Sequence, residues 1–458
     1  MRSRPALLLL LGAAAVFDCG AADAAGKAAA SRVPDPRIAA ALTRISSGRI
    51  RSTIEALVGF GSRSTISTQD PAAIAAGHGI GAAREWIKAQ FAQYSAACGG
   101  CLEVGTDTFT QPPGERVPQP TEITNVYAVL KGTDPDPMRR VVLVSGHYDS
   151  RNSDTADIEH DAPGANDDAS GVAVSLECAR VLSRLKLPAT IVFLTVAGEE
   201  QGLYGSAHFA RMASEQHWGI EAMLNNDIVG GDRSPDQDPR VVRVFSEGLP
   251  EGADARRLLS IRKQGAESDS PSRELARFIV ATGASYDTGV RPQLIFRPDR
   301  YLRGGDQASF NEHGYAAVRF TEYREDFHHQ HQNVRIEDGV EYGDVLKYVD
   351  SDYVARVARL NAATLAALAA APAPPTQVTI QTARLENDST LEWQRSAGAD
   401  GYEVLWRATS SPDWQRALDV GNVTHSTLPI SKDNVIFAVR ARDRQGHRSL
   451  PVVPQPAG

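Results

Sequence analysis

The sequence predicts an α/β fold, a mixed and mostly parallel sheet flanked by helices, followed by a C-terminal all-β sandwich. Two almost continuous apolar runs, 141–145 and 191–196, are typical of strands buried on both faces. Between them, residues 171–185 carry apolar side chains every three or four positions, which indicates a helix. Strands that alternate with helices predict a sheet covered on both sides. A long helical tail is expected over 342–370, and after residue 375 short strands and turns take over.

A chain of 458 residues is too long for one ordinary hydrophobic core, so two or more domains are expected. The sequence divides into three parts. Residues 1–24 combine arginines, a short apolar run and small residues ending in Ala-Asp-Ala, which predicts a secretory signal peptide. Residues 32–370 would form the α/β domain. An Ala/Pro linker then leads into a predicted β-sandwich over 376–458.

The composition and net charge of the chain limit the classes of binding partner and the cellular compartments that we expect. The net charge of −8 argues against a nucleic-acid partner, which usually requires a basic face. After the leader no segment is long and apolar enough to span a membrane, so we expect a secreted or periplasmic protein. A lipoprotein anchored through Cys19 is the alternative, but Phe17 and Asp18 do not fit a lipobox.

The pair Cys98 and Cys101 could be a redox centre, half of a metal site or a short structural disulfide. The pair follows a predicted helix and precedes a predicted strand, whereas a redox pair would follow a strand and open a helix. The chain contains no second CxxC motif. In an oxidising compartment we therefore expect a local disulfide.

Acidic and imidazole side chains follow four predicted strands at the points where those strands end. In an open α/β sheet the ligand crevice lies outside the carboxyl ends of the strands, so these side chains should meet at one edge. They are His147 and Asp149 after 141–145, Glu199 and Glu200 after 191–196, Asp227 after 222–226, and Glu322 with the histidines of 328–331 after 316–321.

Oxygen and nitrogen ligands without thiolate suit Zn²⁺ in a hydrolytic site. A pair of zinc ions needs a bridging carboxylate, and Asp167 is the natural bridge because its tight loop faces the end of the first strand. His147 and Asp227 would complete one metal site. Glu200 and a histidine from 328–331 would complete the other.

Three further side chains are given supporting roles. Asp149 lies two residues after His147 on the same side of an extended chain, so it can hold the second imidazole nitrogen. Glu199 and Glu200 are adjacent, so their side chains diverge, which leaves Glu199 free to act as general base. Asp168 is expected to cap the following helix.

Five segments, HYDS, GANDDASG, AGEEQGLYGS, NNDIVG and GGDQASFNEHGYAAVRFTE, resemble the successive motifs of the M28 family of zinc aminopeptidases. The resemblance covers roughly residues 80–365 and implies two Zn²⁺ per chain, held by the ligands named above. The family places the last histidine four residues before an acid. That frame favours His329, with Asn333 in the place of the acid, and leaves His328 and His331 as alternatives.

The resulting hypothesis is an exported di-zinc metallo-exopeptidase, an aminopeptidase that acts on the N-termini of peptides or proteins. Three alternatives stay open: a carboxypeptidase or dipeptidase, a single-zinc glutaminyl cyclase on the same fold, and a non-catalytic binding protein. The cyclase would not need both His147 and Asp227, and a binding protein would not need Glu199. Zinc is the only cofactor expected.

The C-terminal segment resembles a fibronectin type III module in its Pro-Pro start, Trp393 and Tyr402. It contains no cluster of candidate catalytic residues. It could contact a surface or polymer, pack against the peptidase, or act as a spacer.

Overall fold

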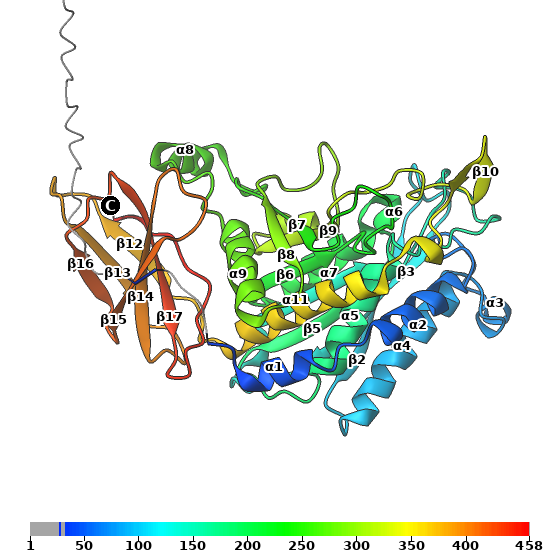
Figure 1. Cartoon of the computed structure of the whole chain (residues 1–458), viewed down its shortest axis with the longest axis horizontal. Coiled ribbons are helices and arrows are strands. Elements are labelled where there is room, and N and C mark those ends of the chain that lie inside the picture. The colour runs from blue at the N-terminus through cyan, green and yellow to red at the C-terminus, as the bar shows by residue number, and fades with distance from the viewer. Residues whose placement is uncertain (1–26, 29–32, 458) are drawn as a thin grey trace, which may run out of the picture.

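The structure of the chain, a computed structural model, describes residues 27–28 and 33–457 (Figure 1). The predicted signal peptide and Cys19 lie outside the described residues. Within the described part, no helix is long and apolar enough to cross a membrane. An α/β part and a C-terminal pair of β-sheets lie side by side in Figure 1, with α8 above the β-sheets at the left of the view.

The α/β part is built on one eight-stranded sheet in the order β2-β3-β5-β4-β6-β9-β7-β8. The four central strands β5, β4, β6 and β9 are parallel, and antiparallel pairings join β2 to β3, β3 to β5 and β7 to β9. The mixed, mostly parallel sheet is therefore confirmed. The strands are β2 (Glu103–Gln111), β3 (Thr121–Leu130), β4 (Val141–His147), β5 (Thr190–Val196), β6 (Ile220–Asn226), β7 (Val241–Ser246), β8 (Arg291–Ile295) and β9 (Ala317–Glu322).

Helices cover both faces of this sheet, and α5 and α11 pack directly against β4. The helices are α1 (Pro36–Leu42), α2 (Ser47–Val58), α3 (Pro71–Ala75), α4 (Gly79–Ala97), α5 (Ala169–Leu182), α6 (Glu199–Gly202), α7 (Tyr204–Glu215), α8 (Ala255–Gln264), α9 (Pro271–Tyr286), α10 (Gln307–Glu312) and α11 (Ser351–Ala370). Two 3₁₀ turns, Pro137–Arg139 and Leu346–Tyr348, and a small hairpin of β10 (Arg335–Glu337) and β11 (Val340–Tyr342) complete this part.

Alternate residues of the central strands belong to two separate hydrophobic cores, one on each face of the sheet. Val142 and Val144 of β4 pack with α2, α5 and α11, whereas Val141 and Leu143 pack with Phe209 of α7 on the opposite face. This is the period-two alternation of a strand, with apolar contacts on both sides. The long apolar runs in the sequence follow from that double burial.

The helical tail is shorter than the sequence suggested. The predicted helix 342–370 begins only at Ser351, after β11 and a 3₁₀ turn. Gly343 has a φ of +113°, which a helix does not accommodate, and the Asp350 side chain accepts hydrogen bonds from the amides of Asp352 and Tyr353 as the helix cap. The segment before the helix is thereby free to approach the sheet edge.

The C-terminal segment, joined by the short N-terminal strand β1, forms two four-stranded sheets that share one core, as the sandwich prediction required. One sheet has the order β1-β15-β14-β17 and the other β16-β13-β12-β18. Trp393 and Tyr402, one from each sheet, face each other in the core with ring centroids 5.4 Å apart. The strands are β1 (Lys27–Ala28), β12 (Thr376–Gln381), β13 (Ser389–Gln394), β14 (Gly401–Ala408), β15 (Arg416–Gly421), β16 (His425–Leu428), β17 (Val435–Arg442) and β18 (Gln455–Ala457).

Two covalent or ionic links stabilise the architecture. Cys98 and Cys101 form the expected local disulfide at the end of α4.

At the boundary with the sandwich, Arg407 of β14 pairs with Asp269 just before α9, and both side chains are almost fully buried. Trp414 donates a hydrogen bond of 2.7 Å from Nε1 to Glu274 of α9. The sandwich therefore packs against the α/β part rather than hanging from a free linker.

Candidate active site

The four central parallel strands bring the predicted polar residues to one edge of the sheet. His147 is the last residue of β4, Glu199 opens α6 shortly after β5, and Asp227 directly follows β6. Asp167 lies on the loop that leads into α5. Because parallel strands end at the same edge, side chains distant in sequence become neighbours.

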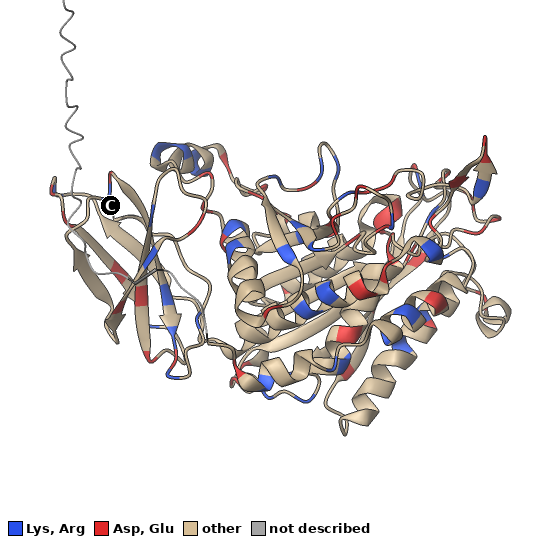
Figure 2. Cartoon of the chain, viewed as in Figure 1, with Lys and Arg blue, Asp and Glu red and all other residues tan. Residues whose placement is uncertain are grey.

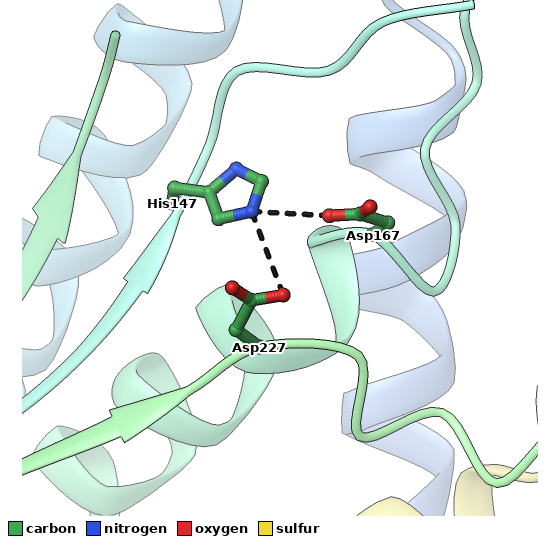
Figure 3. Close-up of side chains that lie close together, drawn as sticks. All are labelled: His147, Asp167 and Asp227. Atoms are coloured by element: carbon green, nitrogen blue, oxygen red, sulfur yellow. Dashed lines mark ion pairs between the residues drawn. The ribbon is translucent and has the colours of Figure 1, made fainter. Parts of the chain in front are cut away.

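One group of side chains gathers around the imidazole of His147. Its Nε2 lies 3.1 Å from Oδ1 of Asp167 and 3.9 Å from Oδ1 of Asp227 (Figure 3). All three residues are buried. Their ligand-type atoms lie within 4.8 Å of one another, close enough to share one metal ion.

A second group lies on the other side of Asp167. Nε2 of His331 is 2.8 Å from Oδ2 of Asp167 and 3.2 Å from Oε1 of Glu200. These atoms also lie within 4.8 Å of one another. The two oxygens of the Asp167 carboxylate therefore face two different groups, as the bridging prediction requires.

His331, not the His329 favoured from the sequence, meets Asp167 and Glu200. Nδ1 of His329 lies 2.6 Å from Oδ2 of Asp232, and the imidazole of His329 stacks on Tyr348 with ring centroids 3.5 Å apart. The backbone of His331 has a φ of +53°, in the left-handed region in which non-glycine residues are uncommon.

His328 and Asn333, the other residues considered for the histidine motif, do not belong to either group around Asp167. His328 pairs with Asp326 and its side chain is 56% exposed. Asn333, expected in the place of the family's acid, accepts a hydrogen bond from the amide of Ser153.

Asp149 supports both groups at once. Its Oδ1 lies 3.5 Å from Nδ1 of His147, on the opposite side of the imidazole from the cluster. Its Oδ2 accepts hydrogen bonds from the hydroxyl of Thr65 and from the amide of Glu200, at 2.9 and 3.1 Å. The buried carboxylate thus fixes the orientation of an imidazole and the start of α6.

The loop that carries Asp167 is held by three buried charged side chains. Asp168 caps α5 as predicted, because its side chain accepts a hydrogen bond from the amide of Gly171. The carboxylate of Asp344 accepts hydrogen bonds of 2.8 and 2.7 Å from the amides of Asn166 and Asp167. The fully buried guanidinium of Arg63 donates to four backbone carbonyls, two of them at positions 163 and 164 of this loop.

Arg319 of β9 is a functional neighbour that sequence reasoning missed. Its Nη1 lies 2.6 Å from Oδ2 of Asp227, and its side chain is fully buried. Asp227 therefore faces His147 with Oδ1, while its Oδ2 is paired with Arg319. A signal was present in the sequence, because an arginine inside an otherwise apolar strand must have a buried partner.

Glu199 is only partly buried and faces a cleft of about 320 Å³. The cleft is also lined by Asp167, Glu200, Asp227 and His331. The two adjacent glutamates diverge as predicted: Glu200 meets His331, and Glu199 forms no ion pair among the described residues.

The electrostatics of the cluster favour cations between its carboxylates. Burial alone would lower the pKa of His147, yet the charge of Glu199 and the surrounding carboxylates raise it well above its ordinary value. Burial also opposes protonation of His331, but Glu200 and Asp167 raise its pKa to about 10. Burial would raise the pKa of Asp167, whereas hydrogen bonds from both imidazoles hold it well below its usual range.

The donor atoms fit zinc. Nε2 of His147 and Oε1 of Glu200 are buried without a hydrogen bond of acceptable geometry, although both lie at ion-pair distance from a neighbour. Buried polar atoms are normally satisfied, so such atoms point to a missing partner. Carboxylate oxygens and imidazole nitrogens are ligands that Zn²⁺ takes in catalytic sites.

The chain resembles known proteins over almost its full length. Residues 125–349 match the model of peptidase family M28. Over 444 residues the chain is 48% identical to a probable zinc metalloprotease of Pyricularia oryzae, covering 94% of this chain and 87% of that protein. The chain belongs to peptidase family M28. A probable zinc metalloprotease of Leptosphaeria maculans is 44% identical over 428 residues, 92% of this chain and 98% of that protein.

This M28 chain is accordingly a zinc-dependent peptidase. Among solved structures, the LapA aminopeptidase of Legionella pneumophila has a TM-score of 0.52 and 21% identity, covering 74% of this chain and 77% of that one. At that identity the likeness concerns the fold. It agrees with the mixed sheet flanked by helices described above.

Proposed function

We propose that this M28 peptidase is an exported di-zinc aminopeptidase that removes residues from the N-termini of peptides and proteins. The observation that carries the proposal is the position of Asp167, whose two carboxylate oxygens face His147 and His331 separately. One carboxylate between two ligand groups is the arrangement that a pair of metal ions requires.

The ligand assignment follows the two groups around the bridge. His147 and Asp227 would complete one zinc site. Glu200 and His331 would complete the other, with His331 taking the place of His329 in the sequence-based assignment. Asp149 would orient the imidazole of His147 from behind.

Glu199 is proposed as the general base. Bound zinc ions supply Lewis-acid polarisation of the substrate carbonyl and lower the pKa of water. Although Glu199 is partly exposed, desolvation of its carboxyl group in the narrow cleft raises its pKa well above its ordinary value, and the charges of Asp227 and Glu200 add to this effect against that of His147. A carboxylate in the cleft with a raised pKa can take a proton from the attacking water and deliver it to the leaving amine.

The size of the cleft and the disulfide support the remaining parts of the proposal. At about 320 Å³ the cleft is at the small end of ligand sites, which suits the end of a peptide better than a long extended segment. The Cys98–Cys101 disulfide supports an oxidising compartment outside the cytosol.

Chromogenic aminoacyl anilides with free and blocked N-termini test this function. We expect hydrolysis of the free substrates, loss of hydrolysis after treatment with a chelator, and recovery on addition of Zn²⁺, because ligands and base act together only around the metal. N-acetylated substrates should be inert. Equal hydrolysis of free and N-acetylated anilides would contradict the aminopeptidase assignment, and full activity after chelation would contradict the zinc mechanism.

A further inference from the structure

Four arginines line the active-site cleft beside its four carboxylates. Arg116 lies on the loop between β2 and β3, and Arg151 lies on the loop after β4. Arg300 and Arg303 lie on the loop after β8, which rises above the sheet in Figure 1 and carries basic residues in Figure 2. The four side chains come from three separate loops, so their convergence on one cleft is a property of the fold.

Two of the four arginines are held by a shared acid. Glu325, whose side chain is 5% exposed, lies 2.8 Å from Arg243, 3.1 Å from Arg300 and 3.3 Å from Arg303. Arg300 also pairs with Asp299 at 3.1 Å. Two carboxylates among three guanidinium groups position the loop after β8 and leave a net positive charge at the margin of the cleft.

Among the described residues, the other two arginines donate hydrogen bonds only to backbone carbonyls. Nη1 of Arg116 donates to the carbonyl of Glu200 at 3.2 Å. Nε and Nη2 of Arg151 donate to the carbonyls of Asn152 and Ser153, at 3.0 and 3.3 Å. In the described part of the chain, neither guanidinium has a carboxylate within ion-pair distance. Each therefore has N–H groups left for a ligand, since a guanidinium carries five donors.

The acids of the cleft cannot serve as partners for these arginines during the reaction. Asp167, Glu200 and Asp227 belong to the proposed ligand set, and Glu199 is the proposed base. Once cations neutralise the ligand carboxylates, the arginines determine the sign of the field in the cleft. A cleft lined by one sign of charge concentrates ligands of the opposite sign.

We propose that Arg116 and Arg151 make this cleft selective for substrates that present a carboxylate next to the scissile peptide bond. The inference rests on the proposed peptidase function and names the substrate class for that same site. Guanidinium groups bind carboxylates through charge-assisted and often bidentate hydrogen bonds, which neutral amides do not reproduce. Two sources place a carboxylate there: the side chain of an acidic N-terminal residue, and the C-terminal carboxylate of a dipeptide.

Paired substrates distinguish the two sources. For the side-chain carboxylate, kcat/KM is compared between α-glutamyl and glutaminyl 4-nitroanilides. For the terminal carboxylate, it is compared between Leu-Gly and Leu-Gly amide. In at least one pair we expect the charged member to be preferred by about 10- to 100-fold, the value of a charge-assisted hydrogen bond. In the double variant Arg116→Gln/Arg151→Gln this ratio should fall to near unity while the zinc content is unchanged.

A matched control and a binding measurement complete the test. Arg51→Gln removes an arginine whose side chain is 50% exposed on α2 and pairs with Glu55, so both members of each pair should be hydrolysed as by the unsubstituted protein. Calorimetry of the zinc-loaded protein should show tighter binding of glutamate than of glutamine, or of glycine, the product that carries the terminal carboxylate of Leu-Gly, than of glycinamide. The double variant should lose that difference.

Distinct outcomes separate the two proposals. Equal rates and equal binding within both pairs would overturn the selectivity, as would a preference that survives in the double variant. If no substrate is hydrolysed but the calorimetric difference is present and lost in the double variant, the carboxylate site stands and the proposed peptidase function fails.

Discussion

Replacement of Glu199 by glutamine is expected to lower kcat by about 10²–10⁴-fold, the usual contribution of a general base. Glutamine keeps the size of the side chain but cannot accept and return a proton. Glu199 faces the cleft and is not part of either ligand group, so the zinc content should stay unchanged. Steady-state kinetics on a free aminoacyl anilide, together with metal analysis of the same preparation, measure both quantities.

A glutamate outside the cleft provides the matched control. The side chain of Glu215, the last residue of α7, is 71% exposed and lies 4.0 Å from Arg211. Glu215→Gln should leave kcat unchanged. Full activity of Glu199→Gln would contradict the assigned base, and loss of zinc from it would place Glu199 among the ligands.

Replacement of Arg407 by methionine is expected to lower the free energy of unfolding by about 3 kcal/mol. Arg407 and Asp269 are 2% and 1% exposed, so the substitution leaves a carboxylate buried without its main partner. Removal of one member of a buried pair costs about 3–5 kcal/mol, and the lower value applies because Arg277 remains 3.8 Å from Asp269. Urea denaturation followed by tryptophan fluorescence measures the change, and Trp414 at this boundary reports on it.

An exposed ion pair in the same sandwich gives the comparison. Arg444 lies 2.9 Å from Asp400, with the two side chains 88% and 35% exposed. Arg444→Met should cost at most about 1 kcal/mol, because solvent screens such pairs. If Arg407→Met were no more destabilising than Arg444→Met, the buried pair would not hold the sandwich to the α/β part.

The strand ends of the site could be predicted because their signals are local. The apolar runs before His147 and Glu199 mark buried parallel strands, and the polar residues that follow must lie at the edge of the sheet. Asp167 was predictable for the same reason, since its loop returns to the end of β4 before α5 begins. These positions depend on hydrophobic patterning and strand direction alone.

The histidine of the second group could not be chosen from the sequence. His329 and His331 lie in a loop without periodicity, and residues two apart in an extended chain face the same side. The choice is made by distant partners: Asp232 binds the imidazole of His329, and Asp167 and Glu200 meet that of His331. Only the folded chain brings these segments together.

The charged residues that hold the loop of Asp167, Asp344 and Arg63, could not be predicted from the sequence for a related reason. Asp344 lies in a segment with apolar spacing that resembled the start of a helix, yet its carboxylate holds the amides of Asn166 and Asp167. Arg63 follows a glycine-rich break and is fully buried against four carbonyls. Their roles depend on backbone groups of other loops, which leave no residue pattern in the sequence.

Zinc content per chain, measured by plasma emission spectroscopy on the unsubstituted protein, His331→Ala and His329→Ala, tests the central claim most directly. With Asp167 between two ligand groups, we predict about two zinc ions per chain in the unsubstituted protein. His331→Ala should retain about one zinc ion and His329→Ala about two, because only His331 meets Asp167 and Glu200. A single zinc ion in the unsubstituted protein, or loss of an ion from His329→Ala but not from His331→Ala, would contradict the bridged site.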